Sequence, residues 1–179
     1  MSAKKNQSNE LVRECMVSAL LKLMETKPIS AVTITELAEK AGVSRMAYYR
    51  NYGSKEEILT THLEEIFAAY QTDITKLNGH GSYNDRRNLL RCFQYFSDHS
   101  DFMKCLYKSG MGYMLLRSLS DYLIATYYSE DKGIFFYYTL QAFAGSLYNT
   151  YIVWILGGLK ESCEDMAKIM SDIYSDKEK

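Results

Sequence analysis

The sequence predicts an all-α protein. A single proline, Pro28, in 179 residues leaves room for long, uninterrupted helices. Apolar residues recur every three to four positions, and no run alternates apolar and polar residues as a half-buried strand does. A chain of this length holds either one large core or a small head and a larger body.

The first predicted helix covers about residues 9–26. Apolar pairs recur along it at helical spacing and give it one stripe to bury. Lys27-Pro28 stops it, because the residue before a proline avoids helical backbone angles.

Two short helices joined by a tight turn follow. Thr33 caps the first of them and forms a capping box with Glu36. Gly42 stands where a helix ends in a left-handed cap, and Ser44 caps the next helix. Helix, short glycine turn and helix form the helix-turn-helix plan, whose second helix enters a DNA major groove.

Residues 9–60 also match a family pattern beyond this general plan. The matching residues are Thr33-Ile34, Ala38, Ala41-Gly42-Val43-Ser44, Tyr48-Tyr49, Tyr52 and Lys55-Glu56-Glu57-Ile58-Leu59. They resemble the N-terminal signature of the TetR family of bacterial transcriptional regulators, whereas the rest of the chain resembles that family only in architecture. The resemblance implies a three-helix DNA-binding head over residues 1–54 and a helical body for effector binding and dimerisation over residues 55–179.

The second helix of the motif carries the side chains that we expect to read DNA. Arg45 and Tyr49 lie one turn apart, so the arginine can bind guanine while the tyrosine meets a phosphate or a thymine methyl group. The resemblance implies that Arg45, Met46 and Arg50 are variable reading positions, at which base preference can differ from that of other family members. The predicted DNA-binding set is Thr33, Ser44, Arg45, Met46, Tyr49, Arg50, Asn51 and Lys55.

Three members of this set, Thr33, Ser44 and Lys55, lie at helix N-termini, where side chains and backbone N–H groups meet phosphates together. The alternative is that Tyr49 belongs to the core and Arg45 is a solvated charge. Tyr48 and Tyr52 occupy the opposite face and are predicted to be core residues.

The charge is divided unevenly along the chain. Residues 1–55 hold nine Lys/Arg against five Glu, net +4, and the remainder holds twelve basic against seventeen acidic residues, net −5. A basic head on an acidic body suits a protein whose head alone meets phosphates.

Six helices are predicted after the motif. One of about residues 55–77 links head and body, and residues 78–82 form a glycine-containing loop. Five body helices follow, at about 84–97, after Ser100, at 114–128, at 132–159 and from Ser162 onward.

The body holds 21 of the 24 aromatic residues, most of them tyrosines. Apolar walls with a few convergent hydroxyl groups are typical of a small-molecule pocket between helices. We expect an apolar or aromatic effector there, with Tyr113, Tyr122, Phe143 and Tyr148 as its contacts. A tyrosine-rich core without a ligand is the alternative.

The last two helices favour a homodimer, which would bind a palindromic operator. Residues 133–159 include no charged side chain, and Met166, Ile169, Met170 and Ile173 are predicted to be buried in one stripe of the final helix. The uncharged segment is long enough to raise the question of a membrane span. Polar residues within it, such as Gln141 and Asn149, argue for a buried helix and against a membrane.

Nothing in the sequence predicts an enzyme, a cofactor or a metal site. No nucleophile-and-base set and no phosphate-binding glycine loop occur, and His62 and Glu65 lack the further ligands of a di-metal bundle. The four cysteines are scattered, as buried free thiols are, and no signal peptide precedes them. We therefore expect a cytoplasmic protein.

The interpretation is a TetR-like DNA-binding regulator, a repressor controlled by a small molecule. An activator of the same fold controlled by a protein partner is the alternative, because the ending Trp154…Gly157-Gly158…Glu161-Ser162 loosely resembles a Gram-positive branch with such a regulator of dihydroxyacetone metabolism. A membrane-associated or structural helical protein is the third possibility.

Overall fold

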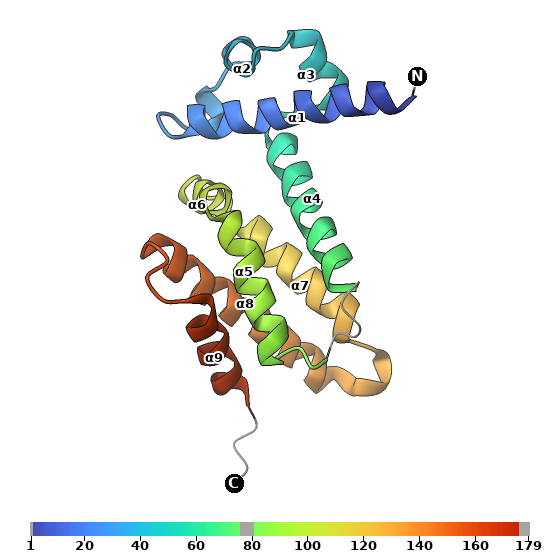
Figure 1. Cartoon of the computed structure of the whole chain (residues 1–179), viewed down its shortest axis with the longest axis vertical. Coiled ribbons are helices and arrows are strands. Elements are labelled where there is room, and N and C mark those ends of the chain that lie inside the picture. Colours follow the sequence, from blue (N-terminus) through green and yellow to red (C-terminus); the bar gives the residue numbers. More distant parts are fainter. Residues whose placement is uncertain (1, 76–80, 176–179) are drawn as a thin grey trace. The chain divides into compact units, whose positions relative to one another are not determined.

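The computed structural model describes residues 2–75 and 81–175 of the chain. In these ranges the regular elements are nine α-helices and two short 3₁₀ turns, without a strand (Figure 1). The predicted all-α class is confirmed.

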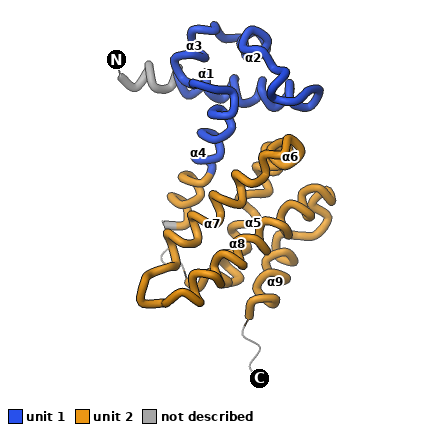
Figure 2. Tube along the Cα trace, turned by 180° about the vertical axis from the view of Figure 1, so that it is seen from behind, with its two compact units in different colours: residues 1–66 blue, residues 67–179 orange. Residues whose placement is uncertain are grey.

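The chain divides into two compact units, residues 1–66 and 67–179 (Figure 2). The division falls inside α4 (Lys55–Thr75), whereas the predicted domain boundary lies at the start of that helix. Arg13 pairs with Glu65, which ties the N-terminal part of α4 to the first helix of the head.

The head consists of α1 (Ser2–Met24), the 3₁₀ turn η1 (Ile29–Ala31), α2 (Ile34–Ala41), α3 (Arg45–Asn51) and the beginning of α4. The helix α1 begins well before its predicted start, in keeping with the high helix propensity of alanine, lysine and glutamine in that segment. The side chains at the centre of the head are almost fully buried, and they include Met16, Leu20, Leu37, Tyr48, Ile58 and Leu59.

The body contains α5 (Arg86–Asp98), α6 (Ser100–Lys108), α7 (Tyr113–Tyr127), α8 (Gly133–Leu156) and α9 (Cys163–Tyr174). These match the five predicted body helices within a few residues. The helix α8 packs against α6 and α7, while α9 packs against α5. Residues 78–80 of the predicted loop lie outside the described residues.

Two polar residues cap the starts of body helices. Asp85 accepts hydrogen bonds from the backbone N–H groups of Arg87 at 2.8 Å and Asn88 at 3.4 Å. Ser162 accepts from Asp165 N–H at 3.1 Å, which caps α9 as predicted.

The helix α8 is uncharged but not buried on all sides. Leu140, Phe143 and Ala144 are almost fully buried, whereas Phe135 and Val153 are exposed. Among the described helices, none is long and apolar enough to cross a membrane.

The final helix corrects one prediction. Met166 and Met170 of α9 are buried, but Ile169 is 44% exposed and Ile173 61% exposed. The two isoleucines lie on a different side of the helix from Met166, Ala167 and Met170, which are the residues of α9 that the single chain buries. The cysteines Cys15, Cys92, Cys105 and Cys163 form no disulfide, as predicted, but each has a partly exposed surface and none is fully buried.

Candidate functional site

The turn between α2 and α3 has the predicted geometry. Thr33 Oγ1 accepts a hydrogen bond from Glu36 N–H at 3.2 Å, and the Glu36 carboxylate accepts from Thr33 N–H at 3.1 Å. Gly42 adopts φ 67° and ψ 29°, the left-handed region that favours glycine, and ends α2. Ser44 Oγ accepts from Ala47 N–H at 3.1 Å and starts α3.

One face of α3 is open to solvent. Arg45 and Arg50 are exposed, Met46 is 70% exposed and Tyr49 is 63% exposed. Most of the surface of Met46 and Tyr49 is therefore in contact with solvent and not with the core of the head. The interpretation of Tyr49 as a core residue is therefore wrong.

The opposite face of α3 anchors it. Tyr48 and Tyr52 are buried, as predicted, and the Tyr48 ring lies 5.2 Å from that of Tyr49 in an edge-on arrangement. The Arg13 guanidinium donates to the Tyr52 hydroxyl and to Glu65, and these interactions raise its pKa. The two Arg13 contacts link α1 to Tyr52, at the end of α3, and to Glu65 in α4.

A second ionic contact fixes the start of α2. Lys27 Nζ donates to Glu36 Oε1 at 2.6 Å, while the other carboxylate oxygen of Glu36 serves the capping box. The hydrogen bond from Lys27, followed by those from Thr33, lowers the pKa of Glu36 to about 2. Neither Arg13 nor Lys27 was singled out from the sequence, because their partners lie on other elements.

Lys55 and Asn51 differ from the other predicted DNA-contact residues. The Lys55 ammonium donates to the carbonyl oxygens of Ile29 at 2.6 Å, Val32 at 2.5 Å and Ser30 at 3.4 Å. Asn51 Nδ2 donates to Ala47 O at 2.8 Å. Lys55 therefore holds the η1 turn, and its donors are directed into the protein.

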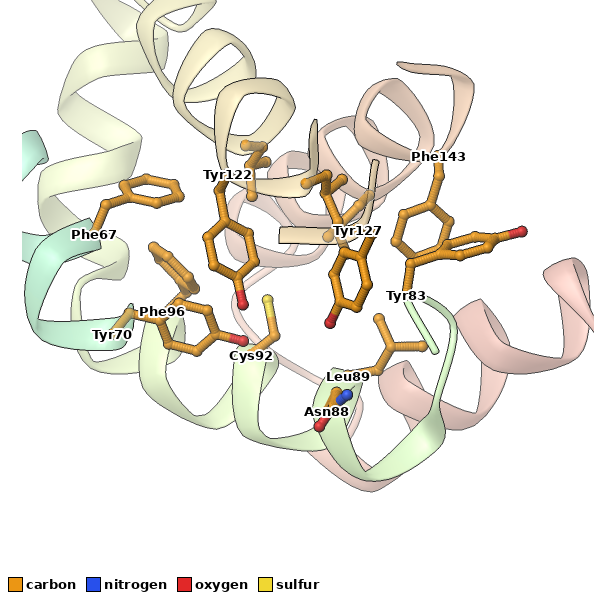
Figure 3. Close-up of a pocket in the computed structure, with 13 residues that line it drawn as sticks. Phe67, Tyr70, Tyr83, Asn88, Leu89, Cys92, Phe96, Tyr122, Tyr127 and Phe143 are labelled. Atoms are coloured by element: carbon orange, nitrogen blue, oxygen red, sulfur yellow. The ribbon is translucent and has the colours of Figure 1, made fainter. Parts of the chain in front are cut away.

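The body contains a small cavity between α4, α5, α7 and α8 (Figure 3). Its volume is about 30 Å³, room for one or two water molecules. The residues that line it are Phe67, Tyr70, Tyr83, Asn88, Leu89, Cys92, Phe96, Leu119, Tyr122, Leu123, Tyr127, Phe143 and Leu147.

Two of the four predicted effector contacts lie at this cavity, and two do not. Tyr122 and Phe143 line it. Tyr113 is 65% exposed. The Tyr148 hydroxyl lies against Gly112, where an added Cβ would be only 2.5 Å away. Helix α7 points Tyr113 outward, which its position in the sequence does not reveal.

The polar groups of the cavity come from three helices and lie together in Figure 3. Tyr70 hydrogen-bonds with Cys92 and Tyr122, Tyr122 with Tyr127, and Tyr127 with Asn88. Burial raises the pKa of the Cys92 thiol to about 12 and raises the pKa values of the three tyrosines. Every group in this chain of contacts is therefore neutral near pH 7.

Tyr70, Asn88, Cys92 and Tyr127 also line the cavity and are not among the contacts predicted from the sequence. A weak signal was present, because Asn88, Cys92 and Phe96 recur at intervals of four and share one face of α5. That spacing is equally typical of core residues, so it could not distinguish a cavity wall.

The comparisons with known proteins agree with this geometry. Residues 16–61 match the family described as bacterial regulatory proteins, tetR family, and residues 86–176 match the family of a transcriptional regulator C-terminal region. The HTH-type transcriptional regulator EthR of Mycobacterium tuberculosis is 29% identical over 82 residues, which are 43% of this chain and 38% of EthR. The chain thus matches less than two fifths of that relative.

Two solved structures share the fold across nearly the whole chain. A TetR transcriptional regulator from Streptococcus agalactiae superposes with a TM-score of 0.64 at 19% identity, covering 97% of this chain and 98% of that one. The dihydroxyacetone kinase operon activator DhaS gives a TM-score of 0.60 at 15% identity, with 90% and 93% covered. At these identities the likeness concerns the fold alone.

Proposed function

Since the chain belongs to the TetR family of bacterial regulatory proteins, we propose that it is a cytoplasmic repressor whose operator affinity a small molecule controls. The observation that supports DNA binding is the solvent-exposed face of α3. Arg45, Met46, Tyr49 and Arg50 project from a helix whose other face is fixed by buried Tyr48.

Each exposed side chain has a chemical counterpart in DNA. Arg45 suits guanine O6 and N7, to which it can donate two hydrogen bonds. Met46 suits a thymine methyl group, while the Tyr49 hydroxyl and Arg50 suit phosphates or base edges. Exposed Thr33 and Ser44 stand at the flanking helix starts, and Asn51 remains a proposed contact despite its bond to Ala47. Lys55 is left out, because its ammonium holds η1.

We propose that two chains pair through α8 and α9. Ile134, Phe135, Tyr138 and Val153 are exposed on α8, as are Ile169 and Ile173 on α9. Covering such an apolar surface with a second copy removes it from water. A two-fold dimer then meets a palindromic operator whose half-sites are about 10 bp apart, or a multiple of that distance.

The helix α4 is the proposed connection between effector and DNA. Phe67 and Tyr70 of α4 line the cavity, and the same helix begins at Lys55 in the head. A molecule that enlarges the cavity would displace these rings. If the effector lowers the affinity for operator DNA by some factor, thermodynamic linkage requires that operator DNA lower the affinity for the effector by the same factor.

A second candidate is an activator controlled by a protein partner. The cavity of about 30 Å³ favours it, because a small-molecule effector needs more room than this conformation provides. The shared fold with the activator DhaS is compatible with it.

Selection of genomic DNA fragments by the purified protein tests the DNA-binding proposal. Arg45→Ala should weaken binding to the selected site by about 1–3 kcal/mol and relax the preference at one base pair. Leu11→Ala, at an exposed position of α1, is the control. If the wild type and Arg45→Ala both bind selected and random fragments with equal affinity, an operator-binding function is excluded.

A further inference from the structure

The body contains a second, smaller void beside the cavity. Its volume is about 10 Å³, and Cys92, Phe96, Leu119 and Leu147 line both spaces. These four side chains form the partition between the two voids. A ligand that displaced these side chains would join the two voids into one larger site.

The wall of the larger void offers hydrogen bonds but no charge. The contacts of Tyr70, Cys92, Tyr122, Tyr127 and Asn88 described above supply groups that both donate and accept. The remaining lining side chains are apolar or belong to Tyr83. The Asp85 carboxylate, which is outside the lining, contributes to the raised pKa of Tyr127 after burial and neighbouring groups.

This makeup discriminates between ligand classes. A carboxylate ligand would enter a space whose lining holds no counter-ion, and an ammonium ligand would lose its hydration without a paired carboxylate in the lining. A hydrocarbon would leave the hydrogen bonds among these side chains as they are and would add none. A hydroxyl group that donates and accepts can enter the chain of contacts without leaving a group unpaired.

We propose that the joined voids bind a small, uncharged aromatic molecule bearing a hydroxyl group, a ligand of the phenol class. Its hydroxyl group lies among Tyr70, Tyr122 and Tyr127, and its ring replaces the partition formed around Phe96 and Leu119. The inference rests on the proposed function, because it names the effector class for the same cavity.

The test titrates the full chain with p-cresol, toluene, benzoate and benzylamine, measured by calorimetry and by Trp154 emission. The ring of Trp154 lies 6.3 Å from that of Tyr151, which lines the smaller void, so joining the voids should change the emission. We expect p-cresol to bind and change it, toluene to bind more weakly, and the two ions not to bind.

Tyr122→Phe removes one hydroxyl group and keeps the ring. It should weaken p-cresol binding by about 2- to 10-fold and leave toluene binding unchanged. Tyr113→Phe, at an exposed position outside the cavity lining, should leave both unchanged. Tyr127→Phe serves as a second variant if Tyr122→Phe does not fold.

Three results would overturn the inference: no binding of p-cresol up to its solubility, toluene binding as tightly as p-cresol, or tighter binding of benzoate. Binding of the selected genomic fragment is measured on the same samples. If p-cresol does not bind but DNA binding is intact, only the proposed ligand class is refuted. If the wild type does not bind DNA, the proposed function is refuted as well.

Discussion

Replacing Lys55 by methionine separates a structural role of this residue from a role in phosphate binding. Methionine keeps most of the aliphatic stem and removes the ammonium donors. In the structure these donors meet the carbonyl oxygens of Ile29 at 2.6 Å and Val32 at 2.5 Å, with Ser30 more distant at 3.4 Å. The variant therefore cuts the link between η1 and the start of α4.

The size of the effect follows from these contacts. A hydrogen bond from a charged donor contributes about 1.5–3 kcal/mol when it is protected from water. Lys55 is half-buried, so water can replace part of what is lost, and the two short contacts together should contribute about 2 kcal/mol. For a chain of this size, that corresponds to a decrease in Tm of about 4–8 °C.

The assay combines urea unfolding, followed by circular dichroism, with the salt dependence of binding to the selected DNA fragment. We expect Lys55→Met to lower the free energy of unfolding and to leave the salt slope of DNA binding unchanged. Lys22→Met, at an exposed position of α1, is the control and should change neither. An unaltered stability with a salt slope reduced by about 0.9 would refute this reasoning and assign Lys55 to a phosphate.

Two further predictions concern the dimer and the head. Ile169→Asp combined with Ile173→Asp should convert the dimer to monomers or insoluble protein, as measured by light scattering. Leu11→Asp, also at an exposed apolar position, is the control and should leave the dimer intact. A wild type that is monomeric at micromolar concentration would contradict the proposed interface. The pKa of Glu36 lies at about 2 in the folded protein, below its ordinary 4.5, so its stabilising effect is present above pH 4.5 and is lost as the pH falls toward 2. Glu36→Gln should therefore flatten the acid dependence of stability in that range, relative to Glu39→Gln on the same helix. An identical acid profile for both variants would count against the Lys27 contact and the capping box as the cause.

Local signals predicted the head in detail. Thr33, Gly42 and Ser44 act within three or four residues of themselves, as caps and a left-handed turn, so the sequence around each contains the whole interaction. The separation of buried Tyr48 and Tyr52 from exposed Tyr49 follows from helical periodicity for the same reason.

Interactions between distant segments were not predictable in this way. Lys55 lies 23 to 26 residues from the carbonyl groups that it meets, and Arg13 lies 52 residues from Glu65. A lysine at a helix start has the same local sequence whether it meets a phosphate or a backbone carbonyl. Only the path of η1 past α4 decides between the two roles.

The amino-acid sequence was sufficient for the all-helical class and the helix-turn-helix, because helix periods, caps and turn glycines are properties of neighbouring residues. The family followed from the resemblance of residues 9–60 to a known signature, which the family matches bear out. The tertiary structure alone decided that Tyr122 and Phe143 share a cavity with Tyr70 and Cys92 while Tyr113 faces solvent. It also decided that Ile169 and Ile173 are left uncovered by their own chain. The physical reason is that a side chain's surroundings depend on how helices cross, and crossing is set by packing between segments far apart in the sequence.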